Sequence, residues 1–220
     1  HTAQDSTEVT LNTFTVSRTQ VSAHYVIGKD GKIFHMLNDY YRAWHGGVGK
    51  WGNDTDLNST SLGIELDNNG FEPFSELQIA SLIQLLEVLK EKYKVPAANF
   101  IGHSDIAPGR KVDPNVFFPW KKLAEKGFGL WYDESVLLED ESEKLKIKDS
   151  LVPEEITLNP GVFTEKRPDP KLALRIIGYD TSDMDAAIKA FKLHFIQKEI
   201  DANLSEQDLK ILYNLYKKYM

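Results

Sequence analysis

His103 and Asp113 are the two residues of this sequence whose types and spacing most clearly indicate chemistry. They lie near the ends of segment 102–114, which Pro108 and Pro114 make stiff and irregular. We expect this loop to fold back so that the imidazole and the carboxylate converge. Both groups bind zinc, and a catalytic zinc site has three protein ligands with an open fourth position. The pair therefore predicts part of a metal site that needs a third ligand.

Strands are predicted on the N-terminal side of this segment. Residues 22–28 and 32–37 are β-rich runs, and Asp30-Gly31 between them predicts a hairpin of two antiparallel strands. The apolar run 61–66 predicts an inner strand followed by a turn. Its single charge, Glu65, stands among apolar neighbours, so we expect a raised pKa, which suits a proton-transfer group.

Helices are expected on both sides of the metal-site segment. Apolar residues with helical spacing follow Ser75, which predicts a helix that Ser75 caps and that ends near Lys94, before Pro96. Residues 99–102 indicate a short strand that leads into the loop, and residues 119–126 a short helix. The fold class is therefore α/β, a mixed central β-sheet flanked by helices.

The pattern of the chain changes after residue 132. Residues 139–148 are strongly charged and residues 153–170 contain four prolines, which is typical of a linker. Three amphipathic stretches follow. We predict one domain at 1–132, a linker at 133–165 and a small three-helix domain at 166–220.

Composition excludes several classes of protein. The chain has no cysteine, so thiolate catalysis, disulfides and cysteine-based metal sites are excluded. Acidic residues outnumber basic ones by 33 to 26, which disfavours a nucleic-acid-binding protein. No apolar run is long enough for a transmembrane helix. The chain starts at His1 without an initiator Met or a signal peptide, so we expect a processed or trimmed product.

Five motifs occur in an order that is similar to that of one known family. They are His-Thr-Ala at 1–3, Ser-Ala-His-Tyr at 22–25, Ala-Trp-His-Gly-Gly at 43–47, Ser-Leu-Gly-Ile-Glu-Leu at 61–66 and the loop 103–113. Together they make nearly all of residues 1–130 resemble the zinc-dependent N-acetylmuramoyl-L-alanine amidases of type 2. This family is related to phage lysozyme-like amidases and to peptidoglycan recognition proteins. The tail resembles, less specifically, a three-helix peptidoglycan-binding domain.

The resemblance implies a role for each matching residue. His103 and Asp113 would be zinc ligands, with one Zn²⁺ per chain, Glu65 the acid/base and Lys111 a cation that stabilises the transition state. Zinc lowers the pKa of its bound water toward about 7, which provides hydroxide near neutral pH. Proton transfer by Glu65 and charge stabilisation by Lys111 would complete the hydrolysis of an amide. Glu65 as a carboxylate at a strand edge and Lys111 as a solvated loop cation remain open alternatives.

The third metal ligand is expected in the first motif. Many relatives carry the ligand two residues before the Ser or Thr of the first motif. Counted from Thr2, that position falls one residue before His1. We expect His1 to be the third ligand, because no other histidine occurs among the first twenty residues. The residue that precedes His1 in a longer chain remains the alternative.

Other residues are candidates for the substrate cleft. His45 lies beside two glycines that would let a ligand approach the backbone, and we expect it to contact substrate, with a packing role as the alternative. Trp44, Asn58 and Arg110 are further candidates for substrate binding. We expect His24 to be a packing or supporting residue, and His35 and His194 to be structural.

Two functional hypotheses follow. The first is a zinc amidase that cleaves the bond between N-acetylmuramic acid and L-alanine in peptidoglycan or its fragments. The alternative is a non-catalytic peptidoglycan-recognition protein. For either, we expect a monomer that binds peptidoglycan or muropeptides and no nucleic acid. Its expected location is the bacterial cell envelope, in the periplasm, lipid-anchored or secreted, rather than the cytoplasm. The tail would hold wall polymer, or would be a helical appendage that packs on the first domain.

Overall fold

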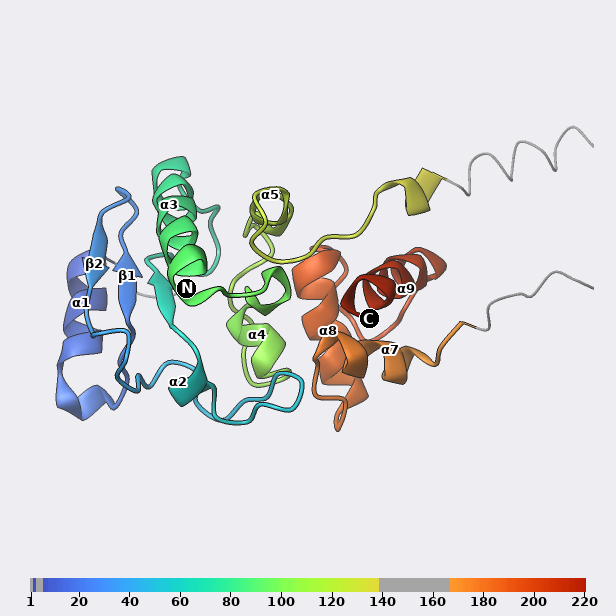
Figure 1. Cartoon of the computed structure of the whole chain (residues 1–220), viewed down its shortest axis with the longest axis horizontal. Helices are drawn as coiled ribbons and strands as arrows, with labels where there is room; N and C mark the ends of the chain where they lie inside the picture. The colour runs from blue at the N-terminus through green and yellow to red at the C-terminus, as the bar shows by residue number, and fades with distance from the viewer. Residues whose placement is uncertain (1, 3–5, 139–166) are drawn as a thin grey trace, which may run out of the picture.

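The structure is a computed structural model that describes residues 2, 6–138 and 167–220. Its N-terminal part, residues 2 and 6–138, forms a mixed α/β arrangement, and residues 167–220 form a helical tail. Figure 1 shows β1, β2 and α1 at one end of the molecule, the tail at the other, and α4 and α5 between them. The predicted linker residues 139–165 lie outside the described residues.

The N-terminal part contains short strands and one long helix. Its elements are α1 (Thr7–Thr15), a 3₁₀ turn (Ser17–Thr19), β1 (Tyr25–Ile27), β2 (Ile33–His35), α2 (Leu57–Thr60), β3 (Ile64–Leu66), α3 (Glu76–Tyr93), a second 3₁₀ turn (Ala97–Asn99), α4 (His103–Ile106) and α5 (Trp120–Glu125). The α/β class predicted from the sequence is confirmed.

The described sheet has three strands in the order β2-β1-β3. β1 and β2 form the predicted antiparallel hairpin, with Val26 opposite Phe34. β3 runs parallel to β1, with Glu65 opposite Val26. The apolar sequence of β3 predicted an inner strand, but among the described strands it lies at the edge. On that edge the backbone amide of Thr2 donates to the carbonyl of Leu66 at 3.0 Å.

Helix α3 is joined to the sheet at the carboxyl ends of β1 and β3. Ser75 caps α3 as predicted, since its hydroxyl accepts from the amide of Gln78 at 3.1 Å. The buried side-chain amide of Gln78 donates to the carbonyls of Ile27, at 2.8 Å, and Asp67, at 3.1 Å. Helix α3 is thereby joined to the ends of both β1 and β3.

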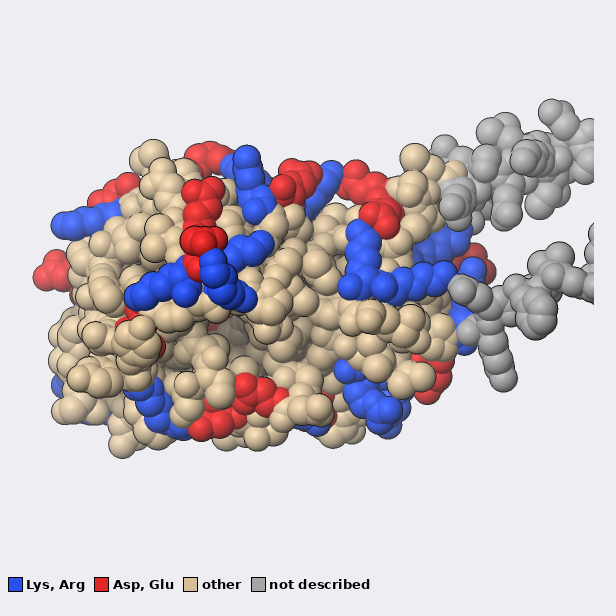
Figure 2. Space-filling model, viewed as in Figure 1, with Lys and Arg blue, Asp and Glu red and all other residues tan. Residues whose placement is uncertain are grey.

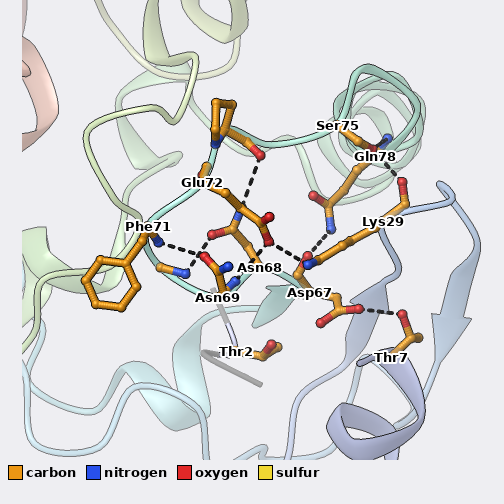
Figure 3. A network of polar contacts seen from close by, with 12 residues as sticks. Thr2, Thr7, Lys29, Asp67, Asn68, Asn69, Phe71, Glu72, Ser75 and Gln78 are labelled. Carbon is orange, nitrogen blue, oxygen red and sulfur yellow. Dashed lines mark hydrogen bonds and ion pairs between the residues drawn. The ribbon is translucent and has the colours of Figure 1, made fainter. Parts of the chain in front are cut away.

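The turn after β3 is held by a polar network (Figure 3). The carboxylate of Asp67 accepts a hydrogen bond from the hydroxyl of Thr7, at 2.5 Å, in α1. Asn68 and Asn115 are both buried, and the amide of Asn115 donates to the Asn68 carbonyl oxygen at 3.2 Å. The network therefore connects β3 to the N-terminal helix and to the chain just beyond Asp113.

The tail forms the three predicted helices. They are α7 (Pro170–Ile177), α8 (Met184–Phe195) and α9 (Glu206–Tyr219). Asp169 caps α7, and α7 ends at Gly178, whose φ of 135° suits glycine. Buried residues from all three helices form one core, which residues from the N-terminal part, including Trp51 and Leu137, also contact.

Two sequence predictions around the metal-site segment are wrong. Residues 99–102 do not form a strand: Ala97–Asn99 is a 3₁₀ turn, and residues 100–102 belong to no helix or strand. His103 then begins the short helix α4 rather than an irregular loop. The carboxylate of Asp105 accepts the amide of Gly102 at 2.7 Å, which favours a helix start at this point.

Candidate metal and acid/base site

Helix α4 and the segment after it bring His103 and Asp113 together, as their spacing predicted. The amide of Ser104 donates to the carbonyl of Asp113 at 2.7 Å, so the segment folds back on the first turn of α4. A Cβ on Gly102 would lie 2.7 Å from Pro114 Cδ and 3.1 Å from the Trp120 ring. The close fit around Gly102 therefore fixes the backbone that carries His103.

The two side chains face each other at a distance that suits a shared cation. His103 Nδ1 lies 3.2 Å from Asp113 Oδ2, and His103 Nε2 lies 3.1 Å from the Gly46 carbonyl oxygen. A carbonyl only accepts, so Nε2 carries a proton. Nδ1 then either donates a second proton to Asp113 or presents its lone pair to a cation that Asp113 shares. Two ligands about 2.0–2.1 Å from a tetrahedral zinc lie about 3.3 Å apart, so both side chains fit zinc.

These two residues are the only predicted metal ligands that lie within the described part of the chain. Among the described residues, no group of three or more His, Cys, Asp or Glu side chains is placed to hold a metal ion. His1, which the sequence predicted as the third ligand, lies outside the described residues. The contact between His103 Nε2 and Gly46 is of the kind that orients metal-binding histidines in proteins.

Glu65 faces the same site from β3. Strand alternation sends Leu66 and Ile64 into the core under α3 and leaves Glu65 on the opposite face. Burial raises the pKa of the Glu65 carboxyl, as predicted, and the charges of Asp113, His103 and Lys111 also act on it. The carboxyl therefore retains its proton at a higher pH than an ordinary glutamate.

Lys111 follows α4 on the same loop. Its backbone amide donates to the carbonyl of Ala107 at 3.0 Å, which folds the loop directly after the helix. Burial alone would raise the pKa of Asp113, but the hydrogen bond with His103 and the positive charge of Lys111 help to hold it below its ordinary value. Lys111 thus contributes positive charge to both carboxylates of the site.

The loop that carries Trp44 and His45 borders the site. His45 is partly buried, and burial, together with the charges of His24 and His103, lowers its pKa to about 4. Its Nε2 atom is buried and has no hydrogen-bond partner among the described residues. A Cβ on Gly63 would lie 2.3 Å from the His45 ring, so only glycine allows this ring to pack on β3. His45 is therefore a neutral imidazole near neutral pH.

Asn58 and Arg110 hold this loop from two sides. Asn58 is buried, and its side-chain oxygen accepts the amides of His45, at 3.0 Å, and Gly46, at 2.8 Å. The Arg110 guanidinium donates to the carbonyls of Gly46, at 2.7 Å, and Val48, at 2.5 Å. The hydrogen-bonding groups of both side chains are thus directed at the loop backbone.

Trp44 is exposed on the same loop. The Arg42 guanidinium lies over the Trp44 ring, 4.4 Å from the ring centroid, in a cation–π arrangement. His24, by contrast, is fully buried: its Nδ1 accepts the Gly63 amide at 3.0 Å and its Nε2 lies 3.0 Å from the Tyr41 carbonyl oxygen. His24 is therefore a packing residue, as expected.

The site opens to the surface through a hollow. Figure 2 shows that this face is hollowed over the space between α2 and α4. A cavity of about 890 Å³ is bordered by His45, Glu65, His103 and Asp113, and it extends to the tail at Gly178. These four side chains therefore border one continuous space.

Sequence reasoning missed three contributors to this arrangement. The Gly46 carbonyl and Gly63 act through the backbone, and only the glycine-containing motifs around them gave a signal. Asp105 is fully buried next to the site although its sequence position resembles that of a polar loop residue. No local pattern distinguishes such an aspartate from a solvated one.

The fold and the site together define a class: an α/β domain in which a His–Asp pair with a spacing that suits a divalent metal lies beside a glutamate whose pKa is raised by burial. Residues 1–116 match the family model described as N-acetylmuramoyl-L-alanine amidase. The chain therefore belongs to the N-acetylmuramoyl-L-alanine amidase family, whose members are zinc-dependent.

The curated proteins that the chain resembles are also amidases. The chain is 38% identical over 150 residues to the N-acetylmuramoyl-L-alanine amidase AmiD of Escherichia coli. This alignment covers 60% of this chain and 53% of AmiD. It is also 38% identical over 104 residues to the 1,6-anhydro-N-acetylmuramyl-L-alanine amidase AmpD of Haemophilus influenzae, with 47% of this chain and 56% of AmpD covered. The matched region thus spans about half the length of these relatives.

Solved structures resemble nearly the whole chain. A complex of Escherichia coli AmiD with anhydro-N-acetylmuramic acid-L-Ala-D-gamma-Glu-L-Lys matches with a TM-score of 0.78 at 29% identity, covering 99% of this chain and 86% of AmiD. AmpDh3 of Pseudomonas aeruginosa, in complex with anhydromuramic pentapeptide, matches with a TM-score of 0.77 at 32% identity, covering 99% and 89%. The likeness therefore includes the helical tail.

Proposed function

We propose that this protein is a zinc amidase that hydrolyses the amide bond between N-acetylmuramic acid and L-alanine. The observation that carries the proposal is the meeting of the His103–Asp113 pair and the raised-pKa carboxyl of Glu65 around one cavity. Family membership supports the reaction type. The ligands of AmiD and AmpDh3 support an anhydromuramyl peptide as a substrate.

The proposal gives each polar side chain a distinct role. His103 and Asp113 would hold the zinc, with His1 as the third ligand. When bound, zinc would polarise the scissile carbonyl and supply a nucleophile from water near neutral pH. The carboxylate of Glu65 accepts the proton of the attacking water and returns it to the leaving alanine nitrogen. The Lys111 ammonium offsets the negative charge that develops on the carbonyl oxygen.

The neighbouring loop would bind and orient the substrate. His45, neutral and with a buried nitrogen that has no described partner, contributes a hydrogen bond to the substrate. Trp44 offers an exposed ring on the same loop as His45. Asn58 and Arg110, which we expected to contact substrate directly, would act mainly by holding the loop backbone.

We further infer a function for each segment of the chain. Residues 1–132 would be the catalytic domain, 133–165 a linker and 166–220 a domain that holds wall polymer. The described residues contain no helix long and apolar enough to cross a membrane. A wall-binding tail favours the bacterial cell envelope as the site of action over cytoplasmic recycling of fragments. We expect the enzyme to act as a monomer.

A cleavage assay tests the proposal. The purified chain is loaded with zinc, zinc content is measured, and anhydro-N-acetylmuramyl peptide and polymeric peptidoglycan are supplied separately. We expect release of free peptide beginning with L-alanine, detected by mass spectrometry, with loss of activity on chelation and recovery when zinc is added back. Intact substrate in the presence of stoichiometric bound zinc would overturn the amidase proposal. Binding of substrate without cleavage would instead support a peptidoglycan-recognition protein.

A further inference from the structure

Asp105 connects the metal-bearing helix to the tail. It is fully buried in α4, two residues after His103. Its Oδ1 atom accepts the Tyr179 hydroxyl at 2.7 Å. Its Oδ2 atom accepts the Gly102 amide at 2.7 Å and lies 2.8 Å from His194 Nδ1. One carboxylate therefore joins two side chains of the tail to the backbone directly before His103.

Helix α4 is too short to define its own position. It spans four residues, and the amide of Ala107 donates to the carbonyl of His103 at 3.0 Å, which is a single turn. Isolated turns of this length are unstable, because the ordering of several residues is offset by very few hydrogen bonds. The orientation of the His103 side chain therefore depends on contacts from outside α4.

The tail supplies these contacts with side chains that are themselves fixed. The His194 ring is stacked on Trp120, with centroids 3.8 Å apart, and on Phe195, at 4.0 Å. Tyr179 is almost fully buried and lies edge-on to Trp51, at 5.3 Å. Neither donor has room to follow a displaced Asp105, so both restrain it.

From this geometry we propose that Tyr179 and His194 of the tail are positioning residues for the metal site. They act through Asp105, which holds the Gly102–His103 peptide and thereby the imidazole of His103. The tail then has a role in metal binding that is separate from any contact with the cell wall. This inference rests on the proposed function insofar as it concerns zinc.

Two substitutions remove the hydrogen bonds while keeping the shape of the rings. Tyr179→Phe deletes the hydroxyl, and His194→Phe deletes the donor but keeps an aromatic ring between its neighbours. Loss of a supporting hydrogen bond around a metal site typically lowers metal affinity 10–100-fold. We expect each variant to bind zinc about 10-fold more weakly than the wild-type chain, measured by competition with a chromophoric chelator. In His194→Asn the amide can replace Nδ1 as donor, so this variant should regain most of the lost affinity.

A matched control separates positioning from general loss of stability. Leu212 is fully buried in the tail core, in α9, and carries no polar group to Asp105. Leu212→Ala should destabilise the fold and leave the zinc affinity of the folded protein at the wild-type value. If Tyr179→Phe and His194→Phe bind zinc as tightly as this control does, the inference is overturned.

A second measurement does not depend on zinc. Amide hydrogen exchange of residues 102–107 is followed in the metal-free full chain under strongly native conditions, where local opening dominates. We expect faster exchange of this segment in Tyr179→Phe and His194→Phe than in Leu212→Ala. Unchanged exchange there would contradict the inference. Failure of the wild-type chain to bind zinc would overturn the proposed function instead, and the exchange result alone would then decide whether the tail positions α4.

Discussion

Glu65 combines two properties that an acid/base residue needs. It lies at the cavity shared with His103 and Asp113, and burial raises the pKa of its carboxyl. A carboxyl with a raised pKa is a stronger base when ionised and can return the proton near neutral pH. Because the ionised form is the one that accepts the proton of water, activity should decline as the pH falls through this raised pKa.

The first prediction concerns Glu65→Gln. The amide keeps the shape of the side chain but cannot accept and return a proton. We expect zinc content near the wild-type value and turnover lower by roughly 10²–10⁴-fold, measured with muramyl peptide. The acidic limb of the pH–rate profile should also disappear from the residual activity.

A neighbouring substitution provides the control. Ile64→Val removes one methyl group from the opposite face of β3 and should affect stability by about 0.5–1.5 kcal/mol without a comparable change in turnover. Full activity of Glu65→Gln would remove Glu65 from the mechanism. Loss of zinc from that variant would make Glu65 a ligand instead.

Asp39 is a second carboxylate with a strongly shifted pKa, but its shift has the opposite direction. Burial would raise the pKa of Asp39, yet hydrogen bonds from Tyr25, at 2.6 Å, Tyr93, at 2.7 Å, and Lys92, at 3.0 Å, hold it well below the ordinary value of 3.8. Its depressed pKa means that the folded state favours the ionised form. Asp39 therefore stabilises the fold above about pH 4, and this contribution is lost as the pH falls further.

The second prediction follows from that sign. Asp39→Asn should lower the free energy of unfolding by roughly 1–3 kcal/mol at pH 7, and by less at pH 3, where the wild-type carboxylate begins to lose its advantage. Urea unfolding at both pH values measures the difference. Asp56→Asn, which removes an exposed carboxylate paired with Arg42, should leave stability near the wild-type value at both pH values. If the loss of unfolding free energy in Asp39→Asn is the same at pH 7 and pH 3, the stabilising role of the ionised Asp39 carboxylate is contradicted.

At the scale of elements, α2 holds the loop that carries Trp44 and His45 through one side chain. Asn58 accepts the amides of both His45 and Gly46, and the Gly46 carbonyl in turn contacts His103 Nε2. Helix α2 is thus connected to His103, the proposed metal ligand, through Asn58 and Gly46. A change in Asn58 should reach the chemistry through the loop backbone.

The third prediction is that Asn58→Ala weakens both stability and metal binding. Two amides that are poorly accessible to water lose their acceptor, which should cost about 1–3 kcal/mol in the free energy of unfolding. Zinc affinity should decline as well, because Arg110 alone would then hold the Gly46 backbone, and the Gly46 carbonyl would be placed less firmly. Chemical denaturation and chelator competition measure the two effects. Thr60→Ala, on the exposed end of the same helix, should leave both near wild type, and equal behaviour of the two variants would refute the connection.

The elements differ in how well the sequence predicts them. Helix α3 and the tail helices were predicted because apolar residues repeat with helical spacing over many positions. Helix α4 was missed because four residues carry no periodic signal, and because its start depends on Asp105. Helix α1 was not predicted either: its Thr-rich sequence has low helical propensity, and tertiary hydrogen bonds such as that from Thr7 to Asp67 help to fix it.

The site residues show the same distinction. His103, Asp113 and Glu65 were predicted because residue type and spacing are enough to indicate their chemistry. Asn58 and Arg110 were predicted to bind substrate, and the sequence gave no sign that their side chains bind the loop backbone. That depends on which loops become neighbours in the folded chain, and no local pattern encodes it.

At the scale of the whole molecule, the N-terminal part and the tail share buried contacts. The Gly52 amide donates to the Gly178 carbonyl at 2.8 Å, and the Gln197 side chain donates to the Phe118 carbonyl at 2.7 Å. The ring of His194 also stacks on Trp120. Domains within one chain commonly have polar, weakly coupled interfaces. Here the interface includes a buried carboxylate with donors from both sides, which favours coupled unfolding.

The last prediction is therefore that the two parts unfold in one transition. All four tryptophans lie between residues 44 and 131, so their fluorescence reports on the N-terminal part and the boundary, whereas far-ultraviolet circular dichroism also reports on the tail helices. Leu212→Ala, in α9, should lower the free energy of unfolding by about 2–5 kcal/mol. With strong coupling it lowers the fluorescence and dichroism midpoints by the same amount.

The matched variant changes the core of the N-terminal part instead of the core of the tail. Leu82→Ala opens a cavity in the core under α3, and it should shift both midpoints together as well. Separate midpoints in either variant, with the tail melting first in Leu212→Ala, would show that the tail is an independent unit. Tyr179→Phe distinguishes the source of the coupling: if the Asp105 hydrogen bonds carry it, this variant should begin to separate the two midpoints although its hydrophobic core is unchanged.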